Sequence, residues 1–286
     1  MKLVTFVDGG RSRAGFVFGS EIVAAEDLDP SLPHTMRELL SVLPQLGQRF
    51  TERPRNTASI PLDDATLLPA IPNPEKIICI GLNYADHAKE SGSAIPEEPV
   101  VFNKFLSALR GNGDPIELPT ASDSVDYEAE LVVVIGKEGK NISESDAMDY
   151  VAGYTCGHDV SARDWQKNKP GGQWLCGKTF DTFAPIGPHI VSADEIPDPH
   201  DLRIQLRLNG ETMQDSSTKQ LIFNVPQLIS YISQVCTFRP GDLIFTGTPP
   251  GVGAARKPPV FLQPGDVAEV EIDGIGLLTN PVVQGK

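Results

Sequence analysis

Three acidic residues alternate along a segment that leads into an apolar run. Asp126, Glu128 and Glu130 stand just before residues 131–135, a run typical of a buried strand. Side chains alternate on a strand, so the three carboxylates would share one face, where they repel one another unless a cation lies between them. The spacing indicates a metal site, with a solvated edge strand as the alternative interpretation.

Asp159 offers a further carboxylate, because it follows a second predicted strand at residues 151–156. Functional side chains often lie where strands run into loops. An all-oxygen ligand set favours Mg²⁺, Mn²⁺ or Ca²⁺ over Zn²⁺, and the sequence lacks the His and Cys spacing of a zinc site.

Two cationic side chains could bind an anion. If residues 161–166 form a helical turn, Arg163 and Gln166 lie three positions apart on one side, where both could contact a carboxylate. A surface ion pair is the alternative for Arg163. Lys178 stands among glycine and aromatic residues, a setting that an anion or metal-bound carboxylates would explain.

His87 and Glu90 are also three positions apart, on a stretch predicted as helix at residues 84–91. A carboxylate beside an imidazole orients the ring and raises its basicity, as a water-activating base requires. Such pairs are also common on helix surfaces, so a plain surface pair is the alternative.

Residues 246–253, which include Thr248, form a glycine-rich loop without the lysine and spacing of a phosphate-binding P-loop. We expect this loop to be a wall or lid for a small anion.

The overall composition is acidic. The 286 residues carry a formal net charge of −14, with a pI near 4.7. This balance argues against a nucleic-acid partner, and it means that an anion-binding pocket needs local cations.

The four cysteines are widely spaced without a CxxC pair, which favours reduced, structural thiols. No signal-peptide or membrane-span pattern is present, so we predict a cytoplasmic protein with no membrane partner.

The hydrophobic pattern predicts more strands than helices. Near the start, Thr35 and Glu38 form a capping box that begins a helix, and a run of prolines marks a boundary near residue 70. The predicted strands are residues 2–7, 15–18, 21–25, 77–80, 127–135, 151–155, 243–245, 267–272 and 276–283. The predicted helices begin at residues 36, 84, 143 and 225. Few connections look like repeated βαβ units, so we expect an α+β, β-rich fold.

Six segments together resemble the fumarylacetoacetate hydrolase family. They follow one another in unbroken order between roughly residues 70 and 283 and read GLNYADHAKE, FNKFLSALRGNGDPIELP, DYEAELVVVIG, GYTCGHDVSARDWQ, GKTFDTFAPIGP and RPGDLIFTGTPPGVG. The resemblance implies a catalytic domain at residues 71–286 whose core is a mixed β-sandwich roll. Residues 1–70 resemble the variable N-terminal extension of longer members, and we expect a small α/β domain there.

The resemblance also implies roles for individual residues. It implies an ordered lid that carries the catalytic pair, a divalent metal, and a set of substrate-binding side chains. The metal ligands are Glu128, Glu130 and Asp159; the catalytic residues are His87, Glu90 and Lys178; and the substrate-binding residues are Arg163, Gln166, Lys178 and Thr248. Asn103 departs from the family pattern, because relatives often have Thr or Phe between the equivalents of Phe102 and Lys104.

Family members of this kind are typically homodimers that split acylpyruvates or related diketo acids, and some decarboxylate oxaloacetate. We therefore predict a divalent-metal-dependent hydrolase that cleaves a C–C bond in a small 2,4-dioxo acid through a metal-bound pyruvate enolate, with Mg²⁺ or Mn²⁺ as cofactor. Oxaloacetate decarboxylation, which makes the same enolate, is the main alternative. An isomerase or hydratase of oxo-enol acids and a non-catalytic metal-binding paralogue rank lower.

Overall fold

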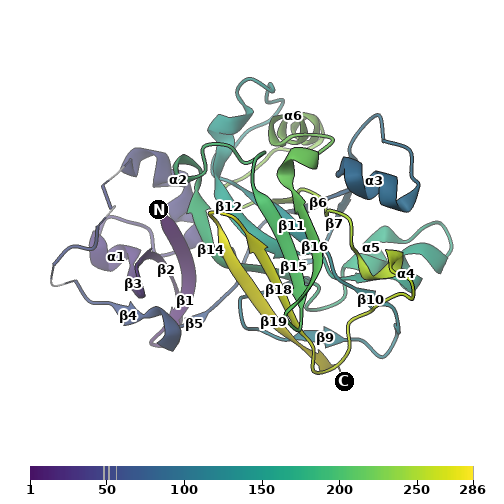
Figure 1. Cartoon of the computed structure of the whole chain (residues 1–286). Helices are drawn as coiled ribbons and strands as arrows, with labels where there is room; N and C mark the ends of the chain where they lie inside the picture. Colours follow the sequence, from purple (N-terminus) through teal and green to yellow (C-terminus); the bar gives the residue numbers. More distant parts are fainter. Residues whose placement is uncertain (48, 51, 56, 286) are drawn as a thin grey trace.

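The computed structural model describes residues 1–47, 49–50, 52–55 and 57–285. Two large sheets, one two-stranded sheet and six α-helices form the framework of this part of the chain (Figure 1). The large mixed sheet has the spatial order β4 (Ile60–Pro61), β3 (Glu21–Ala24), β2 (Arg11–Phe18), β1 (Lys2–Asp8), β14 (Ala184–Ser192), β12 (Val151–His158), β11 (Ala129–Ile135), β17 (Leu243–Phe245), β6 (Ile77–Gly81) and β7 (Val100–Asn103). Two short strands, β5 (Thr66–Leu67) and β8 (Leu109–Arg110), pair with β1 and β14.

The remaining elements cover the large sheet or connect its strands. The second sheet has the order β16 (Glu211–Ser217), β15 (Arg203–Leu208), β18 (Val267–Ile272), β19 (Gly276–Gln284) and β9 (Ile116–Leu118), and β10 (Val125–Asp126) pairs with β13 (Ser161–Ala162). The helices are α1 (Ala25–Leu28), α2 (Met36–Leu46), α3 (Ala85–Ser91), α4 (Arg163–Asn168), α5 (Trp174–Lys178) and α6 (Val225–Val235). Single 3₁₀ turns are η1 (Leu62–Asp64), η2 (Leu106–Ala108), η3 (Ala147–Tyr150), η4 (Ala193–Glu195), η5 (Thr218–Gln220) and η6 (Gly253–Ala255).

Strand β11 lies at the centre of the fold and is buried along its whole length. Because side chains alternate, Leu131 and Val133 pack into a core shared with the five-stranded sheet, while Val132 and Val134 pack into a second core that includes Leu39 of α2. Burial on both faces explains why the strand is a continuous apolar run. The two-layer packing of sheets confirms the predicted β-rich, α+β fold with a mixed β-sandwich roll core.

The N-terminal strands extend the edge of the large sheet. Strand β1 pairs antiparallel with β14, with Lys2 opposite Val191 and Leu3 opposite Ile190. Figure 1 shows this N-terminal part, in purple, beside β14 and away from α3. The division at residue 70 stays a prediction.

A local capping signal in the sequence accounts for some of the helices, such as α2 and α6. Thr35 caps α2 by accepting a hydrogen bond from the backbone N–H of Glu38, as the capping box predicts. The helix predicted from residue 143 is wrong, because Ser143 instead hydrogen-bonds to Asp146 in a turn that leads to η3. Short polar side chains that bond to nearby backbone compete with helix formation.

Two predictions from composition can be compared directly with the fold. The four cysteines are free thiols, as expected, and Cys79 and Cys156 are buried. Within the described ranges, none of the helices combines the length and the apolarity that a membrane crossing requires.

Candidate metal centre and active-site pocket

The register of β11 and β12 brings together two of the predicted metal-binding segments. Glu130 is opposite Gly157 and Ala129 is opposite His158, so the next pair in the register is Glu128 with Asp159. The backbone N–H of Asp159 donates to the carbonyl of Glu128 at 2.9 Å, which continues the pairing beyond the ends of both strands.

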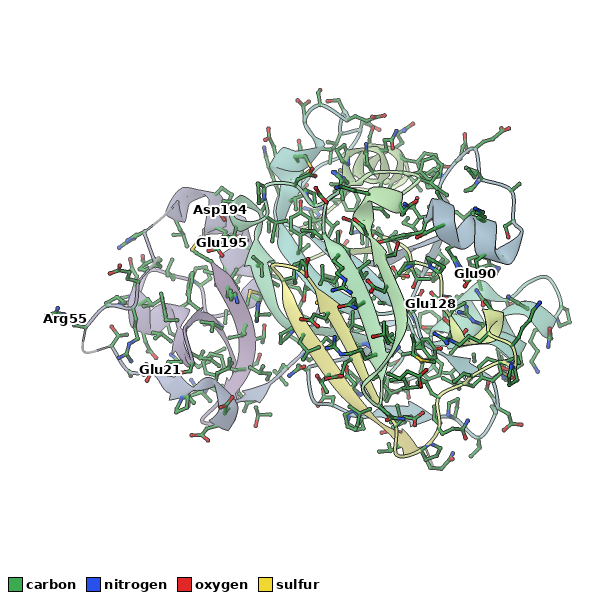
Figure 2. The ribbon with its side chains drawn as sticks, viewed as in Figure 1. Glu21, Arg55, Glu90, Glu128, Asp194 and Glu195 are labelled. Atoms are coloured by element: carbon green, nitrogen blue, oxygen red, sulfur yellow. The ribbon has the colours of Figure 1, made fainter. Side chains whose placement is uncertain are left out.

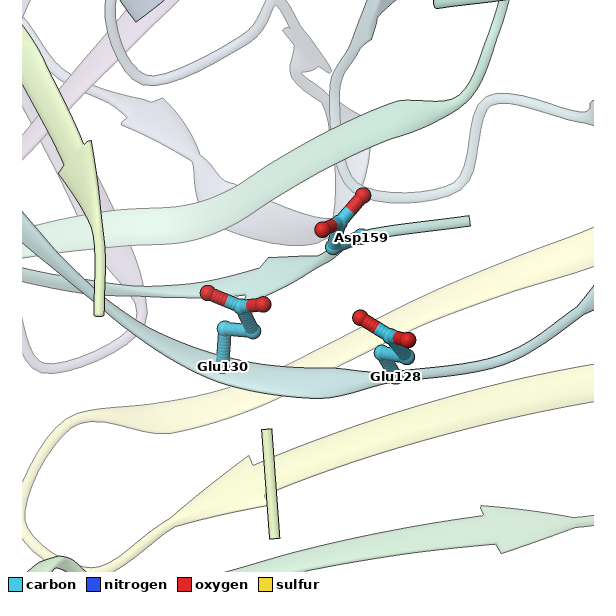
Figure 3. Close-up of side chains that lie close together, drawn as sticks. All are labelled: Glu128, Glu130 and Asp159. Carbon is cyan, nitrogen blue, oxygen red and sulfur yellow. The ribbon is translucent and has the colours of Figure 1, made fainter. Parts of the chain in front are cut away.

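The three carboxylates of Glu128, Glu130 and Asp159 converge. One oxygen from each lies within 4.8 Å of the others, and all three side chains are buried. Figure 3 shows Glu128 and Glu130 side by side along one strand, with Asp159 near them at the end of the neighbouring one. Their burial rules out the solvated edge strand that was the alternative interpretation of this segment.

Asp126 does not join this cluster, so the prediction that it shares a face with Glu128 and Glu130 is wrong. Strand β10 ends at Asp126 and β11 begins at Ala129, and strand alternation therefore does not continue through the two intervening residues. The Asp126 carboxylate instead accepts hydrogen bonds from the backbone N–H groups of Gly253 at 2.6 Å and Ala254 at 3.0 Å. It also accepts from Arg163 Nε at 2.7 Å.

Buried cations partly neutralise the acidic cluster. Lys178 Nζ donates to Glu128 Oε2 at 2.6 Å and to Asp159 Oδ2 at 2.7 Å, and Arg163 lies 2.6 Å from Glu128 Oε1. Burial disfavours the charged form of Glu128, but the attraction of Lys178 and Arg163 outweighs it and holds the pKa of Glu128 well below its usual range. Arg163 is thus part of the buried site, and the surface ion pair considered for it is wrong.

Glu130 has the opposite electrostatic setting. Burial raises its pKa well above the usual value, and the neighbouring carboxylates of Asp159 and Glu128 raise it further. Its partner is the backbone N–H of Gly247, at 2.7 Å, and none of the ion pairs found among the described residues includes Glu130. A cation beside Glu130 would relieve this repulsion.

Asp159 has a buried oxygen with unused bonding capacity. Oδ1 lies 2.7 Å from Lys104 Nζ, yet it accepts no hydrogen bond. The two observations agree, because the Lys104 ammonium directs its three donors at the backbone carbonyls of Val160, Lys178 and Phe183. An orphaned carboxylate oxygen beside two further carboxylates fits a hard divalent cation, which prefers oxygen ligands.

His87 and Glu90 form the predicted pair on α3. Glu90 Oε2 lies 3.1 Å from His87 Nδ1, and Glu90 Oε1 accepts a hydrogen bond from the backbone N–H of Gly251 at 3.0 Å. Glu90 therefore connects α3 to the glycine-rich loop. With Nδ1 engaged, the other ring nitrogen of His87 is the one available for proton transfer.

One cavity of about 440 Å³ contains most of the predicted site residues. Those that line it are His87, Glu90, Glu128, Arg163, Gln166, Lys178 and Thr248. Figure 2 places Glu90 and Glu128 on the same side of the molecule, away from the N-terminal strands that carry Glu21. Glu130 and Asp159 do not line the cavity. Both are buried next to Glu128, which does line it.

Gln166 and Thr248 are oriented by neighbouring side chains. The amide oxygen of Gln166 accepts from Arg163 at 3.0 Å, and the Thr248 hydroxyl oxygen accepts from Gln214 at 2.9 Å. These bonds leave the Gln166 amide N–H₂ and the Thr248 hydroxyl hydrogen as donors at the cavity wall.

Asn103 does not take part in this cavity. It is exposed and lines a different hollow, of about 700 Å³, which is bordered by β7 and α6. This second hollow is larger, but it lacks the acidic cluster and the His87–Glu90 pair, so we place the chemistry in the smaller one.

The sequence reasoning missed several residues of the site, among them Lys104 and Trp174. Lys104, whose side chain is fully buried, forms an ion pair with Asp159. The sequence signal for a buried lysine was its place between Phe102 and Phe105. Trp174 lines the cavity and packs so closely on Gly81 that a Cβ there would lie 2.3 Å from the indole ring. That contact depends on tertiary structure, and the sequence offered no local signal for it.

The comparisons with known proteins agree with this geometry. Residues 76–283 match the family profile described as fumarylacetoacetate (FAA) hydrolase C-terminal. The chain is 50% identical to the mitochondrial oxaloacetate tautomerase fahd2 of Xenopus laevis, over 99% of this chain and 90% of that protein.

Solved structures are also similar over whole chains. A fumarylacetoacetate hydrolase from Exiguobacterium antarcticum has a TM-score of 0.86 and 36% identity, and each chain is covered completely. A maleylpyruvate hydrolase from Sphingobium sp. SYK-6, solved in complex with manganese(II) and pyruvate, has a TM-score of 0.82 and 34% identity, again with complete coverage of both chains.

One prediction from composition is overturned by these relatives. The Xenopus laevis protein is named as mitochondrial, as are relatives from Bos taurus and Homo sapiens, and the expectation of a cytoplasmic protein is therefore wrong. The absence of a secretory signal peptide does not test for a mitochondrial transit peptide, whose pattern is amphipathic and rich in arginine. The matched profile, the relative at 50% identity and the shared fold together establish that this chain belongs to the fumarylacetoacetate hydrolase family.

Proposed function

We propose that the chain catalyses keto–enol tautomerisation of a small 2-oxo dicarboxylic acid of the oxaloacetate type, in a pocket that holds a divalent cation. The observation that carries the proposal is that His87 and Glu128 line one cavity, so a proton-transfer group and one carboxylate of the acidic cluster would face the same bound molecule. The 50% identity to an oxaloacetate tautomerase along nearly the whole chain supports this reaction. It replaces hydrolysis, which the sequence favoured, as the first candidate.

The cation would be held by Glu128, Glu130 and Asp159, and Mg²⁺ and Mn²⁺ are the ions we propose. When bound, such an ion supplies positive charge that holds the carboxylate and the adjacent oxygen of a 2-oxo acid and favours the form in which that oxygen is negative. The relative solved with manganese(II) and pyruvate supports this choice of ion.

The reaction itself needs proton transfers and no water. The enol oxygen loses one proton and the neighbouring carbon gains one, and the atoms of the molecule are otherwise unchanged. We assign the proton transfer to the free ring nitrogen of His87, with Glu90 orienting the imidazole and stabilising its protonated form.

The remaining polar side chains position the substrate. Arg163 and Lys178 provide positive charge at the cavity wall, and Gln166 and Thr248 each provide a hydrogen-bond donor. Lys178 contacts both Glu128 and Asp159, and its ammonium also lies 5.2 Å from the centre of the Phe102 ring. We propose that its role is to hold negative charge on the substrate during proton transfer.

Hydrolysis of an acylpyruvate is the second candidate. It is favoured by the His87–Glu90 pair, because an imidazole oriented by a carboxylate can also activate water. The similarity to a maleylpyruvate hydrolase supports it. Oxaloacetate decarboxylation, the alternative drawn from the sequence, needs no activated water.

One panel of assays tests all three reactions. The purified protein, loaded with Mn²⁺ or Mg²⁺, is given freshly dissolved enol-oxaloacetate, a series of acylpyruvates, and keto-oxaloacetate. Enol loss is followed by ultraviolet absorbance, cleavage by released pyruvate, and decarboxylation by released CO₂. We expect the largest kcat/KM for enol loss. A larger kcat/KM for pyruvate release from an acylpyruvate would reject tautomerisation in favour of hydrolysis.

We also propose that two copies of the chain associate through the surface around β7. This strand ends the large sheet, and the surface beside it exposes apolar side chains, among them Val101 (46% exposed), Phe105 (53%) and Val235 (79%). An apolar sheet edge is a common interface between identical chains. Light scattering should give the mass of a dimer for the wild type and of a monomer for Val101→Asp.

A further inference from the structure

Helix α4 presents three polar side chains to the active-site cavity. Arg163, Gln166 and Lys167 all line it, and their spacing of i, i+3 and i+4 places them on one face of the helix. Arg163 and Gln166 are buried, whereas Lys167, one turn further along, is exposed. The three side chains therefore extend from the depth of the cavity to its rim.

The cationic side chains of this cavity differ in whether they already form ion pairs with carboxylates of the protein. Arg163 pairs with Asp126 and Glu128, and Lys178 pairs with Glu128 and Asp159. Across the part of the chain that the structure describes, no ion pair involves Lys167. Its ammonium is thus available to an anion that enters the cavity.

We propose that Lys167 is a specificity-determining residue that binds the distal carboxylate of a 2-oxo dicarboxylic acid. The inference rests on the proposed function, since it assumes that the carboxylate next to the keto group is bound at the acidic cluster and Arg163. Four residues of helix rise by about 6 Å between Arg163 and Lys167. The two carboxylate carbons of a four-carbon dicarboxylate are about 4 Å apart, given C–C bonds of about 1.5 Å, and the flexible lysine side chain covers the remainder.

This assignment explains how the pocket could separate two classes of substrate. An acylpyruvate with an alkyl end would place methylene groups beside Lys167 and gain no ion pair there. A dicarboxylate would gain an ion pair at the rim in addition to the contacts that its other carboxylate makes at Arg163 and the acidic cluster. Lys167 would therefore favour the dicarboxylate without taking part in the proton transfer.

The test compares two ligands that differ only at their far end. The ligands are 2-oxoglutarate, which has a distal carboxylate, and 2-oxopentanoate, which has a methyl group in its place. Their Kd values are measured by calorimetry with the full chain loaded with Mn²⁺, for wild type, Lys167→Gln and Lys167→Glu. Lys169→Gln is the matched control, because Lys169 stacks over the Trp165 ring at 4.4 Å and does not line the cavity.

We expect Lys167→Gln to weaken 2-oxoglutarate binding by about three- to fivefold, the scale of a partly exposed ion pair, and Lys167→Glu to weaken it more. Binding of 2-oxopentanoate should stay within about twofold of wild type in all variants, as should both ligands in Lys169→Gln. The difference between wild type and Lys167→Gln should shrink at high salt.

Two results would overturn the inference. One is a wild-type protein that binds both ligands equally well, and the other is an equal loss for both ligands in Lys167→Gln. Because these are binding constants, they are independent of turnover. A protein that shows the expected selectivity and no tautomerase activity would reject the proposed reaction and leave the role of Lys167 standing.

Discussion

His87 and Glu90 are held in contact by a third segment of the chain. The Glu90 carboxylate lies 3.1 Å from His87 Nδ1 through one oxygen and accepts the Gly251 N–H through the other. The imidazole orientation therefore depends on both α3 and the glycine-rich loop. A plain surface pair on a helix would not be expected to hydrogen-bond to a loop more than 150 residues away in sequence.

Removing the imidazole should separate catalysis from metal binding. We expect His87→Ala to lower kcat for enol loss by about 10²–10⁴, the usual contribution of a positioned general base, with the Kd for Mn²⁺ nearly unchanged. Glu90→Gln should cause a smaller loss, because the amide can still bond to the ring but cannot stabilise its positive charge. Steady-state kinetics and calorimetry measure the two effects. Wild-type rates in His87→Ala would remove the pair from the mechanism.

The acidic cluster should determine metal affinity. Glu130→Gln and Asp159→Asn keep the side-chain shape but remove the charge that attracts a cation, so we expect at least about tenfold weaker Mn²⁺ binding. Glu144→Gln is the control, since Glu144 is exposed and lies in the connection between β11 and β12, at the end of this strand pair opposite to the cluster. EDTA should abolish activity and Mg²⁺ or Mn²⁺ should restore it. Full activity in metal-stripped protein would refute the ligand assignment.

Asp126 should matter for stability as well as for the substrate. Asp126→Asn would lose the charge that pairs with Arg163 and turn an N–H₂ group toward backbone donors, which we expect to destabilise the fold by about 3 kcal/mol. The KM for the substrate should also rise, because Arg163 loses a fixed orientation. Urea unfolding and kinetics provide the measurements, with the exposed Asp123→Asn as control. Unchanged stability would show that the buried contacts of Asp126 contribute little.

The candidate metal ligands could be picked out from the sequence because each position follows a local rule, and the family resemblance then combined them into one set. Glu128 and Glu130 are two positions apart at the start of an apolar strand, and Asp159 follows the end of another. Strand alternation then failed at Asp126, because the chain leaves regular strand geometry after that residue, and an alternation rule cannot anticipate such a break.

The cations behind the cluster were harder to predict. Lys104 reaches Asp159 across 55 positions of sequence, and its three hydrogen bonds go to backbone carbonyls that any residue could have provided. The residues that surround Lys104 come from strands and loops that meet only in the folded chain. The residues next to Lys104 in sequence therefore do not predict these contacts. The cavity contact between Trp174 and Gly81 is of the same kind.

The buried His189 on β14 should make the folded protein sensitive to acid. Burial and the nearby charge of Lys2 lower the pKa of His189 to about 4, while a hydrogen bond to the Ile275 backbone and the charge of Glu195 act in the opposite direction. The unfolded chain binds a proton at this histidine once the pH falls below about 6.5, whereas the folded protein does not do so until about pH 4. Stability from this group is therefore complete above pH 6.5 and is lost progressively between pH 6.5 and 4, by at most about 3 kcal/mol.

We expect His189→Asn to be less stable than wild type at pH 7.5, because packing is lost, but to lose less further stability on acidification to pH 4.5. The difference between the two proteins isolates His189, since the other buried histidine, His158, contributes equally to both. Urea unfolding at a series of pH values measures it, and parallel pH dependence in the two proteins would mean that His189 takes up its proton at the same pH in the folded and the unfolded chain.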